Sequence, residues 1–275
     1  MNLRTRFRLY LDHLIFKTGI AQSQDIRLDE FRYFLQVNSI NPLNRGGYAV
    51  FSQFDEDGII AEILKRLEIN NGWFLELGVG DGTENNTLNL LTKGWRGLWI
   101  GGQTLISPSF HDSSTLRFVR DWITKDNITE LISSNIDSQD HNFDLISIDL
   151  DGNDFDIWKE VLGKFKSKVL VAEYNGRFDS NTDWVMDYNS SHVWTRDAYF
   201  GVSFKSLVLG LKAYGYTPVA TSLNGTNLFF VADDLLSKFE DVPSDWNDLY
   251  NPARNYLFKT RYKVSRRLFD SIVGN

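Results

Sequence analysis

Short apolar segments alternate with amphipathic helical segments through the middle of the chain, and this alternation constrains the fold more than any other feature. Buried parallel strands form continuous apolar runs, whereas covering helices carry apolar residues three and four positions apart. The pattern predicts a mostly parallel sheet with helices on both faces. The expected strands are WFLELG, GLWIGG, TLRFVRDW, FDLISIDL and KVLVAEY, and the expected helices are residues 51–69, 83–93, a segment from about 126, 154–165 and 204–215.

The last part of the sheet is expected to be antiparallel. Two more strand-like runs, YTPVATS and NLFFVADD, are separated by residues 223–226, which include Asn224 and Gly225. Asn-Gly between apolar runs is the strongest short signal for a β-hairpin. We therefore predict a Rossmann-like α/β fold whose seven-stranded sheet ends in an antiparallel hairpin. A terminal hairpin of this kind distinguishes the methyltransferase type of sheet from the dehydrogenase type.

A glycine-rich turn follows the first expected strand, in the stretch FLELGVGDGTENNT. Gly78, Gly80 and Gly82 stand at every second position, so Thr83 occupies the place where a dinucleotide fingerprint requires glycine. This spacing argues against NAD. Glycines at a strand end permit positive φ and a close approach of backbone to ligand, so we expect the turn to hold a small ligand. A purely structural tight turn is the alternative.

The composition indicates one main domain. The chain has 275 residues, a formal net charge of -7 and no cysteine. The absence of cysteine excludes disulfides and thiolate chemistry, and the acidic balance argues against a nucleic-acid groove over the whole surface. We expect a basic helical extension at residues 1–45, the α/β domain at 46–235 and a basic extension at 236–275.

The two basic ends are expected to be solvated helical faces, with peripheral contact to an anionic surface as the alternative. Neither the opening segment nor any other run has the uninterrupted apolar length of a signal or membrane-spanning segment. We therefore expect a cytoplasmic protein. The sequence does not predict its oligomeric state.

Five segments, in this order, resemble the FkbM-like family of S-adenosylmethionine-dependent methyltransferases: SQFDEDG, FLELGVGDGTENNT, GWRGLWIGG, FDLISIDLDGNDFDIW and VLVAEYN. The resemblance spans about residues 51–234. It implies a class I methyltransferase fold and methyl transfer to an oxygen, commonly a hydroxyl of a sugar or a natural product. It also implies that Asp121, after the third strand, lies near the adenine. The implied cradle of the methionine side consists of Glu76, Gly78, Gly80 and Gly82, with Asp81 and Thr83 beside it.

The second expected strand departs from the family pattern. Such enzymes usually hold the ribose hydroxyls with an acid at the end of this strand, because one carboxylate can accept both hydrogen bonds. Here the segment GLWIGGQ places Gly101 or Gly102 at that position. Either Gln103 accepts a hydrogen bond from a hydroxyl, the backbone of Gly102 approaches the ribose, or the chain has lost the cofactor.

Acidic residues follow the fourth and fifth expected strands. If the fourth strand continues through SIDLD, Asp149 and Asp151 lie on one side of it, and Glu173 and Asn175 follow the next strand. These positions meet at the ligand crevice of an open α/β sheet. Asp149, Asp151 and Asn175 are the predicted ligands of a Mg²⁺ ion, with direct contacts to cofactor and substrate as the alternative. Asp154 is expected to be the N-cap or first-turn acid of the next helix.

A long polar and aromatic segment, residues 175–203, precedes the helix at 204–215. Connections of this length are usually functional. Aromatic faces beside polar groups suit a sugar, and a packed cover over the sheet is the alternative. His192 is a candidate general base for an alcohol, since its pKa lies near neutrality, and a plain surface histidine is the ordinary interpretation.

The predicted function is S-adenosylmethionine-dependent O-methylation of a sugar, glycan or related small molecule. The enzyme would mainly align the acceptor for in-line attack on the methyl group, and Asp149, Asp151, Glu173 or His192 would assist deprotonation. The alternative is a non-catalytic methyltransferase-like protein that binds a glycan or a protein partner through the same edge. The glycines of WIGG favour that alternative and the SIDLDGND segment disfavours it, while the acidic balance disfavours nucleic-acid methylation.

Overall fold

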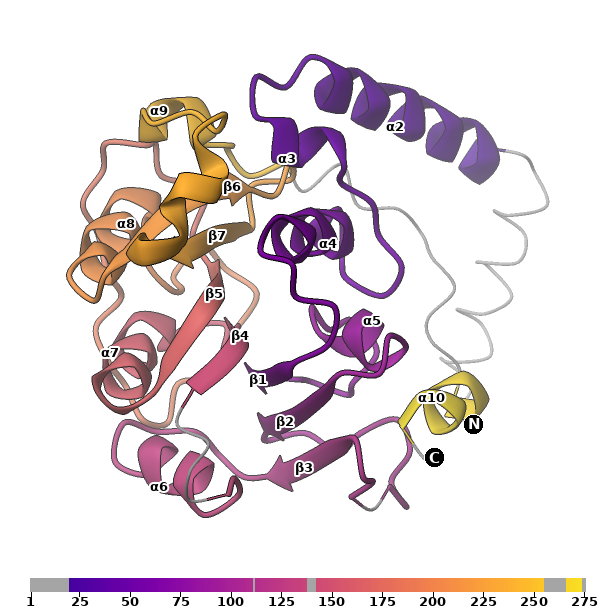
Figure 1. The fold of residues 1–275 in the computed structure, drawn as a ribbon, viewed down its shortest axis with the longest axis vertical. Coiled ribbons are helices and arrows are strands. Elements are labelled where there is room, and N and C mark those ends of the chain that lie inside the picture. The colour runs from indigo at the N-terminus through magenta and orange to yellow at the C-terminus, as the bar shows by residue number, and fades with distance from the viewer. Residues whose placement is uncertain (1–19, 111, 138–141, 255–265, 274–275) are drawn as a thin grey trace.

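A mixed β-sheet forms the centre of the computed structural model, which describes residues 20–110, 112–137, 142–254 and 266–273 (Figure 1). The sheet has the strand order β3-β2-β1-β4-β5-β7-β6. Strand β7 runs antiparallel to both of its neighbours, and the other neighbouring pairs are parallel. The seven strands are β1 (Trp73–Leu77), β2 (Arg96–Gly101), β3 (Leu116–Arg120), β4 (Asn142–Ile148), β5 (Lys166–Glu173), β6 (Tyr216–Thr221) and β7 (Asn227–Ala232).

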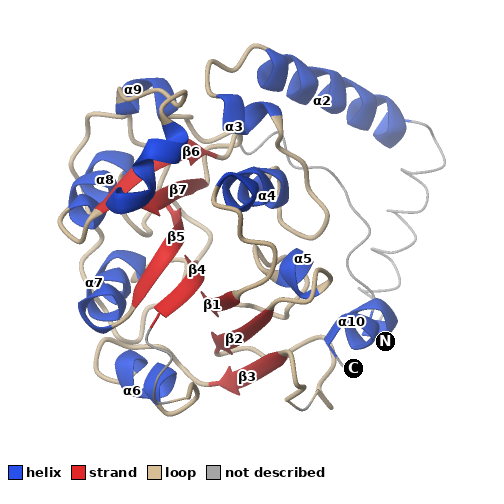
Figure 2. Ribbon diagram, in the orientation of Figure 1, coloured by secondary structure: helices blue, strands red, loops and turns tan. Residues whose placement is uncertain are grey.

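Helices cover both faces of the sheet (Figure 2). Helices α6, α7 and α8 lie along one face, and α4, α5 and α10 lie along the other (Figure 1). The predicted parallel sheet with a terminal antiparallel hairpin is therefore confirmed. In the described residues the helices are α2 (Ile20–Val37), α3 (Pro42–Arg45), α4 (Glu56–Arg66), α5 (Leu88–Leu91), α6 (Ile128–Ser133), α7 (Asp154–Lys164), α8 (Phe204–Lys212), the 3-10 helix η1 (Asp233–Phe239), α9 (Trp246–Leu249) and α10 (Arg266–Val273).

Two buried clusters fill the layers between the sheet and its helices. Ile146 and Ile148 of β4 pack into the cluster that contains Trp158 of α7, whereas Leu145 packs into the opposite cluster. Side chains of a strand alternate between its two faces, so β4 buries apolar residues on both sides. This two-sided burial is the reason that the strands are continuous apolar runs in the sequence.

Two of the predicted boundaries that differ from the structure lie next to the glycine turn and the acidic residues. The helix predicted over residues 83–93 forms only as α5, because the backbone N–H groups of Asn86 and Thr87 donate to the carboxylate of Glu76 instead of entering a helix. The fourth strand ends at Ile148, before the two aspartates that were expected to continue it.

Parts of both predicted extensions pack on the α/β domain. The side-chain amides of Asn41 and Asn44 donate to carbonyl oxygens of β6, each at 2.7 Å. Beyond residue 235, Leu249 and Phe269 are buried in the core clusters. The basic segment at 1–18 and most of the one at 254–267 lie outside the described residues, so their predicted surface contact stays a prediction. No helix in the described ranges combines the length and the apolar character needed to cross a membrane.

Candidate functional site

The glycine turn has the left-handed backbone that its sequence predicts. Gly78, Gly80 and Gly82 have φ values of 85°, 55° and 84°, a conformation that glycine adopts without steric cost. Two of the three are enclosed: a Cβ on Gly78 would meet the Asp149 carbonyl oxygen, and a Cβ on Gly82 would stand 2.8 Å from the Phe269 ring. At Gly80, none of the described residues places a heavy atom within 4 Å of the Cβ position. The turn therefore presents open backbone at Gly80.

Glu76 supports the turn from inside the protein. Its buried carboxylate accepts hydrogen bonds from the N–H groups of Asn86 (2.9 Å) and Thr87 (3.2 Å) and from the Thr87 hydroxyl. Burial raises the pKa of Glu76 to about 7, and the hydrogen bonds lower that pKa in part. The Thr87 hydroxyl also accepts a hydrogen bond from the indole N–H of Trp99 at 2.8 Å. These contacts fix the chain that returns from the glycine turn.

Asp81 and Thr83 stabilise the other side of the turn. The Asp81 carboxylate accepts hydrogen bonds from the Thr83 N–H at 3.2 Å and from the Thr83 hydroxyl at 2.5 Å. The backbone carbonyl of Asp81 accepts from Ile106 at 2.8 Å, which ties the turn to the segment after β2. Both side chains therefore lie beside Gly80 and Gly82, as the sequence predicts, and both have structural partners.

The ends of β2 and β3 lie next to each other, since the Asp121 N–H donates to the Gly101 carbonyl at 3.2 Å. A Cβ on Gly101 would stand 3.0 Å from a Val79 methyl group, so a larger residue there would press on the glycine turn. Gly102 is exposed, and a Cβ on it would stand 3.2 Å from the Trp122 ring. Packing against the glycine turn thus favours glycine at position 101, where members of the family usually have an acidic residue.

Trp122 lies beside these strand ends and is not among the site residues predicted from the sequence. Its ring is 48% exposed beside Gly102, and its indole N–H donates to the Ser190 carbonyl at 2.6 Å. The available signal was its position directly after Asp121. Gly102, Gln103 and Asp121 are all exposed at this end of the sheet, so the predicted adenosine-side residues come together there with Trp122.

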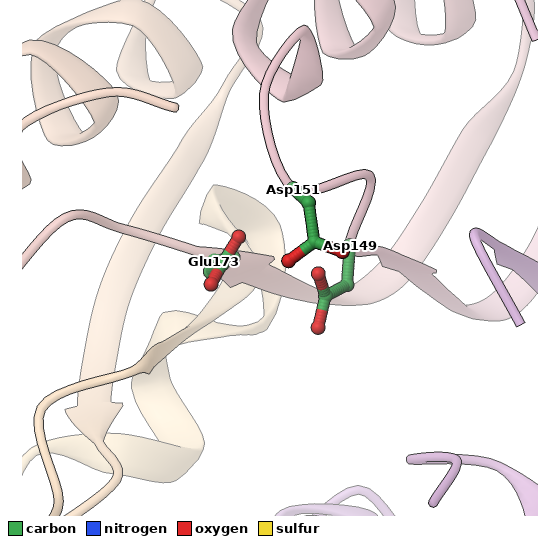
Figure 3. A group of neighbouring side chains, drawn as sticks. All are labelled: Asp149, Asp151 and Glu173. Atoms are coloured by element: carbon green, nitrogen blue, oxygen red, sulfur yellow. The ribbon is translucent and has the colours of Figure 1, made fainter. Parts of the chain in front are cut away.

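Three carboxylates meet where β4 and β5 end (Figure 3). Asp149, Asp151 and Glu173 each place an oxygen within 4.8 Å of the others. The predicted reason for this meeting is wrong, because Asp151 is not on an extended strand but has a left-handed backbone with φ of 54°. The turn at Asp151, rather than strand alternation, brings the two aspartates to Glu173.

Asp154 holds this acidic loop in place. Its buried carboxylate accepts hydrogen bonds from the N–H groups of Leu150 (2.7 Å) and Gly152 (2.9 Å). Asp154 is a first-turn acid of α7, as predicted, while Asn153 is the N-cap residue. Burial raises the pKa of Asp154 to about 6. The contacts determine the path of residues 150–152 and hence the position of Asp151.

The electrostatics of the loop disfavour several ionised carboxylates at once. Burial is the main cause that raises the pKa values of Asp149, Asp151 and Glu173. The neighbouring acids raise the pKa values of Asp149 and Glu173 further, and His192 lowers the pKa of Asp151. The arrangement can therefore retain a proton or hold a cation.

The long segment crosses the acidic loop and brings His192 to it. The Nε2 atom of His192 lies 3.2 Å from the Asp151 carbonyl oxygen, and its ring covers Gly152. Asn153 and Asn189 fix the crossing, since the Asn153 amide donates to the Asn189 carbonyl (2.8 Å) and accepts from the Asn189 N–H (3.1 Å). The predicted candidate base thus lies at the acidic loop.

Asn175 anchors the same segment through its side-chain amide. Its buried side-chain N–H groups donate to the carbonyls of Ala198 and Phe200, both at 3.0 Å, and its Oδ1 accepts from the Arg177 N–H at 3.3 Å. These contacts use the amide at both ends. The Asn175 amide nitrogen is therefore committed to the segment, and among the acidic residues Glu173 joins the two aspartates. The assignment of Asn175 as a metal ligand stays a prediction.

The aromatic residues of the segment form a packed cover with exposed edges. Phe178 and Trp184 have ring centroids 4.8 Å apart, and Trp184 meets Tyr199 edge-on at 5.7 Å. Trp194 and Tyr199 remain 38% and 51% exposed. This packing is compatible with both predicted roles, which are a packed cover over the sheet and an aromatic surface that contacts a sugar.

No family model matches the chain, and no curated protein matches it. Among solved structures, the glycopeptide N-methyltransferase MtfA matches with 13% identity and a TM-score of 0.36, over 67% of this chain and 94% of MtfA. CalO1, a methyltransferase in calicheamicin biosynthesis solved in an SAH-bound form, matches with 12% identity and a TM-score of 0.35, over 79% of this chain and 60% of CalO1. Similarity at this level carries no conclusion about activity.

The fold class rests on the topology itself. The seven-stranded sheet, its terminal antiparallel hairpin and the helices on both faces are the features that the sequence predicts for this class, and the strand order is β3-β2-β1-β4-β5-β7-β6. The chain therefore has the Rossmann-like fold of class I methyltransferases.

Proposed function

We propose that this protein is an S-adenosylmethionine-dependent O-methyltransferase of the FkbM-like type, which methylates a hydroxyl of a sugar or related small molecule. The observation that carries the proposal is the open backbone at Gly80, two residues from Gly78, which itself contacts Asp149 of the acidic loop. A partly accessible glycine backbone with open space beside it, close to acidic groups at the carboxyl ends of the strands, suits a small ligand next to candidate catalytic carboxylates. The order of the five family-like segments supports the same activity.

The cofactor would lie across the ends of β1, β2 and β3. The methionine part would contact the backbone around Gly80, while Asp81 and Thr83 keep the turn in shape. The adenosine part would lie beside Gly102, Gln103 and Asp121, with the exposed Trp122 ring offering a stacking surface. An aromatic face is a favourable surface for an adenine ring, and stacking there would compensate for the missing ribose carboxylate.

The residues of the acidic loop would then act on the acceptor. S-adenosylmethionine supplies an electrophilic methyl group, so the protein has to align the acceptor oxygen with it and remove one proton. Asp149, Asp151 and Glu173 are carboxylates at the required edge, and His192 lies at the Asp151 carbonyl. The exposed Trp194 and Tyr199 of the cover would contact the apolar face of a sugar.

A non-catalytic binding protein with the same fold is the second candidate. The packing at Gly101 favours it, because Val79 leaves little room for the carboxylate that usually binds the ribose. Such a protein would bind a glycan or a protein partner at the same edge and transfer no methyl group.

Release of S-adenosylhomocysteine measures the proposed activity directly. The full chain is incubated with S-adenosylmethionine and a panel of monosaccharides, oligosaccharides and phenolic or aliphatic alcohols, and product is detected by mass spectrometry. A methylated hydroxyl that depends on Gly80 and on His192 supports the enzyme. Binding of a panel member without product, in a protein that also fails to bind S-adenosylmethionine, supports the second candidate.

A further inference from the structure

Among the described residues, His192 lies near the carboxylates of Asp149, Asp151 and Glu173 and acts on the charge of Asp151. None of the ion pairs found there involves these three side chains. Their oxygens nevertheless lie within 4.8 Å of one another. Like charges at this distance repel unless a proton or a cation lies between them.

A buried oxygen of Glu173 supplies an independent observation. Its Oε2 atom is inaccessible to solvent and has no hydrogen-bond partner among the residues that the structure describes. Figure 3 shows the Glu173 carboxylate next to the side chains of Asp149 and Asp151. A buried carboxylate oxygen without a donor loses the hydration it has in water, so a ligand is expected to satisfy it.

The geometry points to a divalent metal ion, and we propose that Asp149, Asp151 and Glu173 bind one such ion at the carboxyl ends of β4 and β5. Carboxylate oxygens are the preferred ligands of Mg²⁺, Mn²⁺ and Ca²⁺. Opposite oxygens around an octahedral Mg²⁺ lie about 4 Å apart, and those around Ca²⁺ about 5 Å apart. The observed limit of 4.8 Å between the carboxylate oxygens falls within this range, so small side-chain rotations close the site on either ion.

The site has one open side. Asp151 is exposed, whereas Glu173, the last residue of β5, is only partly accessible. The Asp154 carboxylate accepts hydrogen bonds from the N–H groups of Leu150 and Gly152. The acidic loop is therefore held in position before any ion binds. Mg²⁺ and Mn²⁺ usually keep several non-protein ligands. Water or an acceptor hydroxyl can occupy these positions on the open side.

This role rests on the proposed methyltransferase function. A hydroxyl bound to the ion loses its proton more easily and is held in a fixed direction. The ion therefore favours acceptors with two adjacent oxygens, such as a vicinal diol or a catechol, since both oxygens can occupy neighbouring coordination positions. His192 would take the proton at Nδ1, because its Nε2 faces the Asp151 carbonyl oxygen at 3.2 Å and donates to it.

Electron paramagnetic resonance of Mn²⁺ tests the site without any cofactor or acceptor. The metal-free full chain is titrated with MnCl₂, and Mg²⁺ and Ca²⁺ are then added as competitors. The wild type is expected to bind one Mn²⁺ ion saturably. Asp151→Asn and Glu173→Gln should each weaken binding at least about tenfold, because each removes a charged ligand. Asp248→Asn, an exposed carboxylate on α9, is the matched control and should change binding less than about twofold.

Asp151→Asn keeps the test decisive if Glu173→Gln fails to fold, because Asp151 is exposed. Wild-type protein without saturable Mn²⁺ binding, or unchanged binding in folded Asp151→Asn, overturns the site. Calorimetry with S-adenosylhomocysteine in the presence of a chelator separates this failure from that of the proposed function. Cofactor binding without Mn²⁺ binding contradicts the proposed metal site alone. Mn²⁺ binding without cofactor binding contradicts the proposed methyltransferase activity alone.

Discussion

The carbonyl oxygen of Asp149 fills the space beside Gly78 that any side chain would occupy. An ideal Cβ at position 78 would stand 1.6 Å from that oxygen, and Gly78 has φ of 85°. This contact joins the end of β1 to the end of β4. The glycine turn and the acidic loop are therefore in direct backbone contact, so a displacement of one shifts the other.

Gly78→Ala should lower the free energy of unfolding by about 3 kcal/mol or more, because the left-handed backbone and the overlap with Asp149 both oppose a side chain. Gly163→Ala is the matched control, since Gly163 is an exposed α7 residue with open space at its Cβ position. That control should be neutral or up to about 1 kcal/mol more stable. Urea denaturation followed by circular dichroism measures both values, and equal stabilities of the two variants would contradict the contact.

The buried Glu76 makes stability depend on pH. Its pKa rises from 4.5 in the unfolded chain to about 7 in the folded protein. Below pH 4.5 both states hold the proton; as the pH rises towards 7, only the folded state keeps it, so unfolding releases a proton and stability falls. The loss is roughly 3 kcal/mol over this interval, at about 1.4 kcal/mol for each pH unit.

Glu76→Gln tests this dependence, because glutamine does not titrate. The variant should be less stable by about 1–3 kcal/mol at low pH, since an amide cannot accept all three hydrogen bonds. Its free energy of unfolding should fall less steeply between pH 4.5 and 7 than that of the wild type. Urea denaturation at a series of pH values measures the free energy of unfolding of both proteins. Parallel pH curves for the variant and the wild type would show that Glu76 does not titrate in this range.

Phe269 of α10 packs against the glycine turn at Gly82. Its buried ring lies against Gly82 and contacts the rings of Trp99 and Phe110. Phe269→Ala should cost about 3–5 kcal/mol where α10 stays docked, as other large-to-small core changes do. Arg266→Ala is the surface control, because it removes only an exposed ion pair with Asp270 and a hydrogen bond to Ser109, and it should cost less than about 1 kcal/mol.

Thermal unfolding and limited proteolysis of α10 measure this difference. If Phe269→Ala and Arg266→Ala lower stability equally, α10 does not support the turn. Weaker binding of S-adenosylhomocysteine in Phe269→Ala, but not in Arg266→Ala, is also expected, since the ring fixes the position of Gly82.

The sheet could be predicted because its strands are buried on both faces and are therefore apolar throughout. The hairpin could be predicted from Asn224 and Gly225, which form a turn whose glycine has φ of 75°. The helix at 83–93 could not be predicted correctly, because long-range hydrogen bonds to Glu76 override its local helical pattern. Local patterns fail where a buried polar group takes the backbone donors.

The candidate site was predicted in its residues more accurately than in its geometry. The acids after β4 and β5 do meet, but Asp151 reaches the group through a left-handed turn that alternation does not describe. The loop-anchoring hydrogen bonds of Asn175 could not be predicted, because amides that anchor a loop and amides that bind metal look alike in a sequence. The packing of Phe269 on Gly82 joins positions 187 residues apart and has no local signal, although apolar residues at 269, 272 and 273 indicate a buried face.

The central claim is that the open backbone at Gly80 binds S-adenosylmethionine, and calorimetry with S-adenosylhomocysteine tests it most directly. The wild type should bind one molecule per chain. Gly80→Ala should remain folded, at a cost of about 1–2 kcal/mol for its left-handed backbone, and should lose at least about tenfold in affinity because its methyl group enters the ligand space. Gly163→Ala should bind as the wild type does. Absence of binding to the wild type, or equal affinities for folded Gly80→Ala and wild type, would contradict the claim.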